Sequence, residues 1–139
     1  MTNKIFSFFS GAGFLDLGFE SEGFEVAFVN EYHAPFLDAY QYARTKLNIG
    51  PPKYGYHFGS ITDLLTPEPN KKLSEYVADS RKDGSFVGFN GGPPCPDFSI
   101  AGKNRGKDGF VVELGQLNIL LTSAICFVSI QTCFWNYNA

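Results

Sequence analysis

The stretch Ile5-Phe6-Ser7-Phe8-Phe9-Ser10-Gly11-Ala12-Gly13 decides the fold of this 139-residue chain. Its first five residues are mostly apolar and β-prone, which predicts a buried strand. The glycines after it predict a tight turn, because glycine adopts positive φ without steric penalty. Phe14 to Phe19 then has the apolar content of a short helix. This order of strand, glycine turn and helix favours an α/β fold.

The same alternation continues along the chain. Glu25 to Asn30 and Ser85 to Phe89 predict further buried strands, and Ala34 to Lys46 and Lys71 to Ser80 predict helices. Pro51 to Phe58 is expected to be a loop because it carries prolines and a glycine. The stripe expected to be buried in the first of the two helices consists of Phe36, Leu37, Tyr40, Ala43 and Leu47. Alternating strands and helices predict a parallel sheet with crossover helices.

The charge and cysteine content exclude several classes of protein. The net charge of −3 argues against a protein that coats nucleic acid, although Lys103, Arg105 and Lys107 form a local basic patch. The three cysteines form no C-x-x-C pair, so we expect neither a disulfide framework nor a zinc site. A reducing compartment is therefore favoured.

The C-terminal segment carries no charged side chain from Leu114 to Ala139. One interpretation is a membrane span. The other is a buried helix followed by a buried strand, and it is favoured because polar residues interrupt the apolar run and no basic flank follows. We therefore expect no membrane association.

A cysteine lies between prolines in Gly91-Gly92-Pro93-Pro94-Cys95-Pro96-Asp97-Phe98-Ser99, directly after a predicted strand. Glycine and proline at this density exclude a helix or a central strand, so Cys95 is expected on a stiff loop at a strand end. Open α/β sheets place their chemistry at such ends. Cys95 is therefore interpreted as a nucleophile, with a packing role as the alternative.

The glycine turn is either a plain turn or a ligand site. A helix start after such a turn offers free N–H groups to an anion. The dinucleotide fingerprint requires a third glycine, and Asp16 stands at that position. Because a carboxylate disfavours a nearby pyrophosphate, S-adenosylmethionine is expected rather than NAD or FAD.

Glu31 follows the second predicted strand, where doubly wound folds place an acid that binds ribose hydroxyls. Alone it would be interpreted as a solvated loop acid, but together with the glycine turn it favours an adenosyl ligand. Tyr32 and Ile61 are candidate faces for the adenine ring, and the alternative is that both are ordinary, partly buried apolar residues.

Four stretches together resemble the cytosine-C5 DNA methyltransferases: Phe9 to Gly13, Leu15 to Glu20, Asn30-Glu31, and Gly91 to Cys95 with Phe98-Ser99. The resemblance covers roughly residues 3 to 109. It implies a Rossmann-like fold for S-adenosylmethionine-dependent methyltransferases, with a partial parallel sheet and flanking helices. Residues 1–110 would be the N-terminal part of the catalytic domain, and residues 111–139 a tail that diverges from the family.

The resemblance also implies roles for individual residues. The Cys95 thiolate would add to C6 of a cytosine flipped out of double-stranded DNA, with Pro94 orienting the base. No metal is implied. The residues implied to bind S-adenosylmethionine are Phe9, Gly11, Ala12, Gly13, Leu15, Glu31, Tyr32 and Ile61. Those implied to contact DNA are Ser99, Lys103 and Arg105.

The chain departs from the family in ways that affect its expected activity. Pro96 stands where glutamine is usual, Ser60 stands where an Asp commonly precedes the isoleucine, and the family's Glu-Asn-Val strand is missing. We therefore expect a truncated or frame-shifted product, inactive alone, that self-associates or needs a complementing subunit. The alternative is a non-catalytic module that binds S-adenosylmethionine. The resemblance further implies a bacterial cytoplasmic location and a cognate restriction endonuclease.

Overall fold

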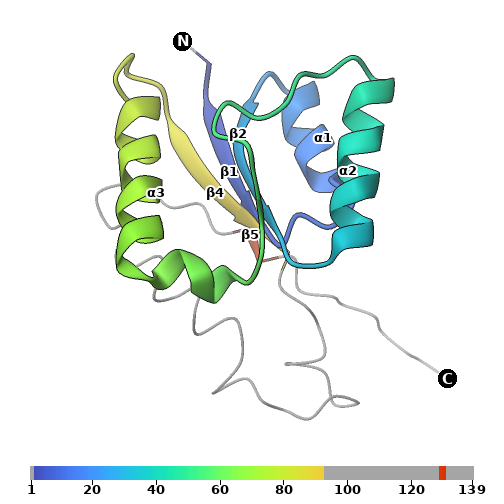
Figure 1. The fold of residues 1–139 in the computed structure, drawn as a ribbon. Coiled ribbons are helices and arrows are strands. Elements are labelled where there is room, and N and C mark those ends of the chain that lie inside the picture. Colours follow the sequence, from blue (N-terminus) through green and yellow to red (C-terminus); the bar gives the residue numbers. More distant parts are fainter. Residues whose placement is uncertain (1, 93–128, 131–139) are drawn as a thin grey trace, which may run out of the picture.

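The computed structural model describes residues 2–92 and 129–130. The strands form one parallel sheet in the order β3-β2-β1-β4-β5 (Figure 1). The expected α/β class, a partial parallel sheet with flanking helices, is therefore confirmed. In chain order the elements are β1 (Lys4–Phe8), α1 (Phe14–Ser21), β2 (Glu25–Glu31), α2 (Ala34–Lys46), β3 (Tyr56–Phe58), a 3-10 helix (Ile61–Leu65), α3 (Pro67–Ser80), β4 (Val87–Gly91) and β5 (Ser129–Ile130).

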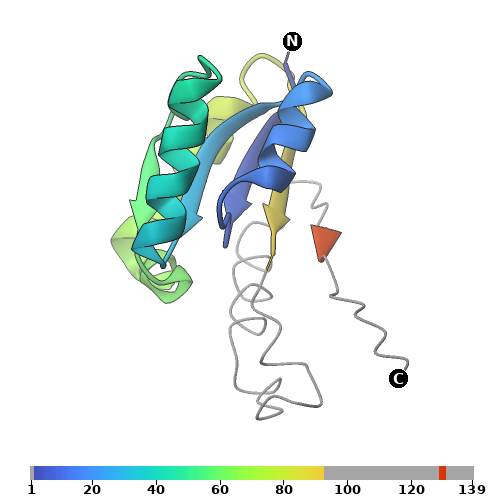
Figure 2. The same ribbon diagram turned by 90° about the vertical axis from the view of Figure 1, so that its right-hand side faces the viewer.

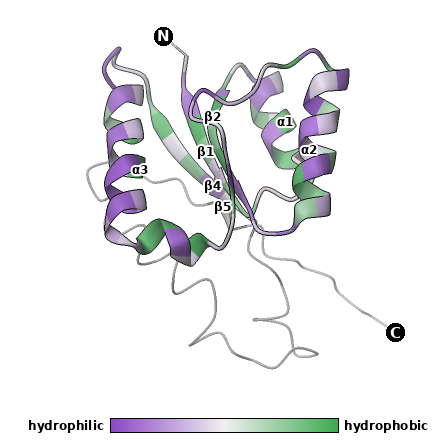
Figure 3. Cartoon of the chain, in the orientation of Figure 1, coloured by the Kyte–Doolittle hydropathy of each residue, from purple (hydrophilic) through white to green (hydrophobic). Residues whose placement is uncertain are grey.

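Helices cover both faces of the sheet, α1 and α2 on one face and α3 on the other (Figures 1 and 2). The larger part of the core lies on the α3 face, where Phe6, Phe8, Phe28 and Phe89 pack with ring centroids 5.7–6.0 Å apart. Hydrophobic residues concentrate in the strands, while the outer sides of α2 and α3 are largely hydrophilic (Figure 3). This burial explains why the strands read as nearly continuous apolar runs.

The expected buried stripe of α2 is correct only in part. Leu37 and Tyr40 are buried, but Phe36 and Leu47 are 50% and 55% exposed. Arg44 takes a buried place instead, because its guanidinium donates to the Gly50 carbonyl at 2.6 and 2.9 Å. Leu37, Tyr40 and Arg44 are spaced three and four residues apart, so they lie on one face of the helix. An arginine can occupy the buried face because its apolar stem packs and its guanidinium is hydrogen-bonded.

The loop expected over Pro51 to Phe58 is wrong at its C-terminal end. Tyr56–Phe58 pairs with Val29–Glu31 and forms the edge strand β3. The helix expected from Lys71 begins earlier, at Pro67, since proline is well suited to the first turn of a helix.

The strand expected over Ser85 to Phe89 lies two residues later, at Val87–Gly91. It extends through Asn90 and Gly91 because these residues pair with Ser7 and Phe8 of β1. The last residues of β4 therefore belong to the sheet, and the chain leaves the sheet at Gly92.

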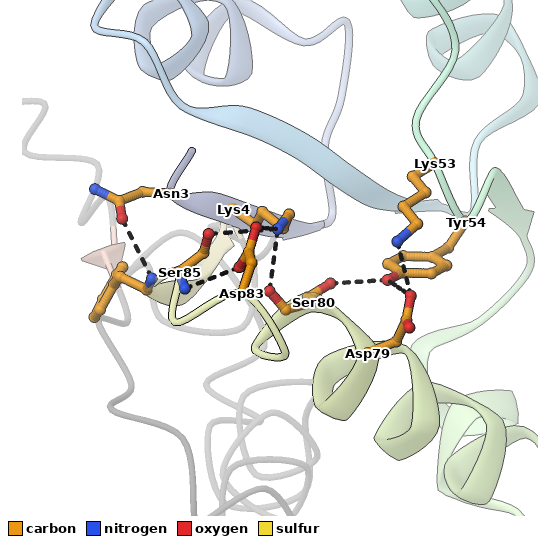
Figure 4. Close-up of polar contacts among 9 residues, drawn as sticks. Asn3, Lys4, Lys53, Tyr54, Asp79, Ser80, Asp83 and Ser85 are labelled. Atoms are coloured by element: carbon orange, nitrogen blue, oxygen red, sulfur yellow. Dashed lines mark hydrogen bonds and ion pairs between the residues drawn. The ribbon is translucent and has the colours of Figure 1, made fainter. Parts of the chain in front are cut away.

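A polar network fastens α3 to the amino-terminal edge of the sheet (Figure 4). The buried Lys4 ammonium donates to the Ser80 carbonyl at 3.1 Å and pairs with Asp83 at 3.2 Å. The Ser80 hydroxyl donates to the Tyr54 hydroxyl at 3.0 Å, which donates to Asp79 at 2.8 Å. None of these contacts lies at the opposite, carboxyl-terminal edge of the sheet, where the candidate site is found.

Candidate cofactor site

The carboxyl ends of β1 and β4 meet where the chain changes faces of the sheet. After β1 the chain continues into α1 on one face, whereas β4 is reached from α3 on the other (Figure 1). Phe8 and Gly91 are the last paired residues of these two strands. Doubly wound sheets bind ligands in the crevice at this kind of switch point. The glycine turn begins directly beyond it.

The turn is held in a left-handed backbone conformation at three places. Phe9, Gly11 and Gly13 have φ values of 51°, 56° and 87°. For a bulky residue such as Phe9 this conformation costs about 1–3 kcal/mol, and such strain concentrates at functional sites. The Gly13 N–H donates to the Ser10 carbonyl at 3.1 Å and closes the turn.

The two glycines are needed for different reasons. A Cβ built on Gly13 would lie 2.5 Å from two atoms of the Tyr40 ring, so this glycine admits a neighbouring side chain. A Cβ on Gly11 would meet nothing within 4 Å. Open space beside the backbone is what a ligand needs for close approach, and the structure provides it at Gly11.

Glu31 is the last residue of β2, is 7% exposed, and is tied to the glycine turn. One carboxylate oxygen accepts the Gly11 N–H at 2.7 Å, and the other accepts the His33 N–H at 2.8 Å. Each oxygen keeps acceptor capacity for a further donor. The structure therefore brings together the two positions that the sequence predicted to share one ligand.

Asp16 does not face the turn. It is 1% exposed, and its oxygens accept from Ser7 Oγ at 2.8 Å, Asn90 Nδ2 at 3.0 Å and Tyr40 OH at 2.8 Å. Burial raises the pKa of Asp16, opposed by these hydrogen bonds. The argument that this carboxylate would repel a pyrophosphate at the turn is therefore wrong.

The remaining residues predicted to bind the cofactor differ in exposure. Ala12 and Leu15 are half-buried in and after the turn, and Tyr32 is 70% exposed beside Glu31. Ile61 is 1% exposed and packs in the core on the α3 face. Ser60, which precedes it, caps the 3-10 helix by accepting from the Thr62 N–H at 3.3 Å.

The predicted catalytic and DNA-contacting residues lie outside the described residues; they are Pro94, Cys95, Ser99, Lys103 and Arg105. Most of the uncharged tail lies outside them too. The structure describes Gly91 and Gly92, where the predicted catalytic loop begins. The Gly92 N–H donates to the Phe8 carbonyl at 3.4 Å, so this loop leaves the sheet at the same edge as the glycine turn.

Sequence reasoning missed several features around the turn. Phe14 and Phe58 are exposed aromatic residues at the carboxyl-terminal edge, 83% and 60% exposed. Ser10 Oγ is buried without a hydrogen-bond partner among the described residues, as is Asn90 Oδ1. The sequence marked Ser10 and Asn90 only by their position, because each is a polar residue next to the end of a predicted strand.

A groove in the described part of the chain lies elsewhere. It has a volume of about 570 Å³, lies between α3 and the β3 edge, and contains none of the predicted site residues. Tyrosines and lysines form part of its lining, among them Tyr54, Tyr56, Lys71, Lys72 and Tyr76. No helix in the described ranges is long and apolar enough to cross a membrane.

Comparisons with known proteins identify the family. The model of the C-5 cytosine-specific DNA methylases matches residues 3–117. The chain belongs to this family. It is 59% identical over 122 residues to the type II methyltransferase M.NmeDI of Neisseria meningitidis serogroup C, covering 88% of this chain and 28% of that relative.

Two further relatives of this methylase chain are also type II methyltransferases. M.NgoPII of Neisseria gonorrhoeae is 40% identical over 105 residues, covering 76% of this chain and 25% of the relative. M.FnuDI of Fusobacterium nucleatum is 35% identical over 103 residues, covering 74% and 24%. The chain thus spans about a quarter of the length of the relatives it matches.

Proposed function

We propose that this chain provides the cofactor site and the nucleophile of a DNA (cytosine-5-)-methyltransferase that uses S-adenosylmethionine. The observation that carries the proposal is the bond between Glu31 and the Gly11 N–H at the switch point of the sheet. The bond holds the Glu31 carboxylate, which we propose as the acceptor for the ribose hydroxyls, against the glycine turn. Membership of the C-5 cytosine-specific DNA methylases supports the same assignment.

The residues around the turn fit S-adenosylmethionine. Glu31 would accept the ribose hydroxyls with the acceptor capacity left on its two oxygens. Gly11 offers unobstructed backbone, and the unpartnered Ser10 hydroxyl offers a further polar group. The exposed Tyr32 ring would provide an adenine face. When bound, the cofactor supplies an electrophilic methyl group on a sulfonium.

Cys95 would activate the other substrate. Its thiolate forms a bond to C6 of cytosine, and the ring electrons shift so that C5 becomes nucleophilic. After methylation, loss of the C5 proton and cleavage of the S–C6 bond restore the ring and the thiolate. Pro94, next to Cys95, would orient the base. The loop that carries them follows β4, one strand away from the glycine turn.

Double-stranded DNA is the proposed partner, with the target cytosine flipped out of the helix. Ser99, Lys103 and Arg105 would contact its phosphate backbone. The carboxylate that holds the base and the parts that read the DNA sequence would come from polypeptide other than these 139 residues, so we propose a complementing partner and inactivity of the chain alone. A bacterial cytoplasmic location and a cognate restriction endonuclease accompany this proposal.

A second candidate is a module that binds S-adenosylmethionine without catalysis. It is favoured by one observation: the bonds that Glu31 accepts from the Gly11 and His33 N–H groups depend on no residue of the predicted catalytic loop. In this case the chain would bind the cofactor for a partner that performs the transfer.

A trapping assay separates the two candidates. The chain is incubated with S-adenosylmethionine and duplex DNA containing 5-fluorocytosine, which blocks the loss of the C5 substituent and retains the thiol adduct. We expect an adduct on Cys95 once a second polypeptide is added that carries the part of M.NmeDI not matched by this chain. With Cys95→Ser we expect no adduct. Cofactor binding without an adduct under these conditions would favour the module.

A further inference from the structure

The sheet-facing side of α1 is formed around an acid. Asp16 is the only residue of this helix that is buried. Three donors converge on it from three other elements: Ser7 of β1, Tyr40 of α2 and Asn90 of β4. We call these four residues the Asp16 cluster. A buried carboxylate is costly unless it is hydrogen-bonded, and the three bonds that offset this cost also tie β1, α2 and β4 to one side chain of α1.

No direct ion pair within residues 2–92 compensates the Asp16 charge. The nearest guanidinium contact is indirect. Arg44 Nη1 lies 3.5 Å from the Tyr40 hydroxyl and pairs with Glu20 at 2.9 Å. The carboxylate therefore depends on its three neutral donors, and their positions are fixed by it in turn.

Tyr40 connects the Asp16 cluster to the glycine turn. The Tyr40 ring is the surface against which Gly13 packs, with no room for a Cβ between them. Its hydroxyl is anchored on Asp16 at 2.8 Å. The position of Asp16 thus sets how closely the glycine turn can approach α2.

Asn90 connects the Asp16 cluster to the end of β4. This residue is 4% exposed and precedes the last residue of the strand. The outer neighbour of β4 in the described part is only the two-residue strand β5. The Asn90 side chain therefore holds the end of β4 to α1 through its bond to Asp16. This contact lies just before the residues that lead to Cys95 in the sequence.

We propose that Asp16 is a positioning residue that fixes the glycine turn and the end of β4 relative to each other. This inference rests on the proposed function, because that function gives the two segments their roles in cofactor binding and catalysis. The link itself depends only on the contacts of the Asp16 cluster.

Hydrogen exchange of the full chain tests the link without a ligand. Asp16→Leu removes the shared acceptor, and we expect at least tenfold faster exchange of the amides at 11–17 and at 90–92, with α3 unchanged. Asp16→Asn should stay within threefold of wild type, because the Asn90 amide can turn over and accept from the new amide group. Ser7→Ala is the matched control, and it should also stay within threefold.

Three results would overturn the proposal: acceleration of only one of the two segments, equal acceleration in Ser7→Ala, or uniform acceleration that includes α3. If Asp16→Leu does not fold, Asn90→Ala replaces it. That variant should accelerate exchange at 90–92 beyond the effect of Ser7→Ala, and equal exchange in both would refute the link.

Calorimetry with S-adenosylmethionine separates this inference from the proposed function. Asp16→Leu should weaken binding at least fivefold and Asp16→Asn less than twofold. Unchanged affinity in Asp16→Leu would refute the positioning role. Absence of binding to the wild-type chain, with the exchange pattern as expected, would contradict the proposed function and support the link within the fold.

Discussion

Replacement of Gly13 by alanine tests how the turn is held in place. Two costs add at this position. Alanine in the left-handed backbone conformation, at φ 87°, costs about 1–2 kcal/mol. The new methyl group would lie 2.5 Å from the Tyr40 ring, and forcing a methyl into a packed region costs about 1–3 kcal/mol. The expected loss in the free energy of unfolding is therefore about 2–5 kcal/mol.

Two other glycines serve as matched controls. Gly11→Ala has the backbone cost alone, about 1–2 kcal/mol, because its φ is 56° and its surroundings are open. Gly18→Ala lies inside α1 with open space around it, and it should stabilise the chain by about 0.5–1 kcal/mol.

Urea unfolding followed by circular dichroism gives the free energy of unfolding of the wild type and of the three variants. From most to least stable, the expected order is Gly18→Ala, wild type, Gly11→Ala and Gly13→Ala. The reasoning would be refuted if Gly13→Ala were no less stable than Gly11→Ala, because the contact with Tyr40 would then contribute nothing.

Three further predictions test other parts of the structure. Glu31→Gln should lower the free energy of unfolding by about 1–3 kcal/mol in urea, because one of two part-buried backbone N–H groups would then face an amide NH₂; unchanged stability would contradict this. Lys4→Met should cost about 1–3 kcal/mol, since the buried Ser80 carbonyl loses its donor, and Asp83→Asn should cost less; the reverse order would count against the network. Burial raises the pKa of Asp16, so the native state binds a proton before the unfolded state does as the pH falls. Wild type should therefore gain stability relative to Asp16→Asn as the pH falls toward about 4, the ordinary pKa of an aspartate, and a relative loss would refute the direction of the shift.

The sequence predicted the elements that have a strong local signal. The largely apolar runs at Ile5 to Phe9 and Glu25 to Asn30 predicted the two central strands Lys4–Phe8 and Glu25–Glu31. Of the residues in these runs only Phe9 falls outside the strands, because it lies in the turn with a φ of 51°. The edge strand Tyr56–Phe58 was missed because it is three residues long and follows a glycine and two prolines. It is held by pairing with β2, which a local pattern does not report.

The candidate site could be predicted in part for the same reason. The glycine turn and Glu31 follow strand ends, and neighbouring parallel strands bring such ends together. The direction of Asp16 could not be predicted, because it depends on Asn90, which is 74 residues away in the sequence. Likewise, the sequence indicates that Gly13 lies in a turn but not that the Tyr40 ring occupies the space of its missing side chain.

The central claim is that the turn at Gly11 and the carboxylate of Glu31 form one adenosyl site. Isothermal titration of the chain with S-adenosylmethionine, beside Glu31→Ala and a surface control such as Glu22→Ala, tests it most directly. We expect one saturable site in the wild type and in the surface control, with at least tenfold weaker binding in Glu31→Ala. Equal affinity in all three proteins, or no binding heat in the folded wild type, would contradict it.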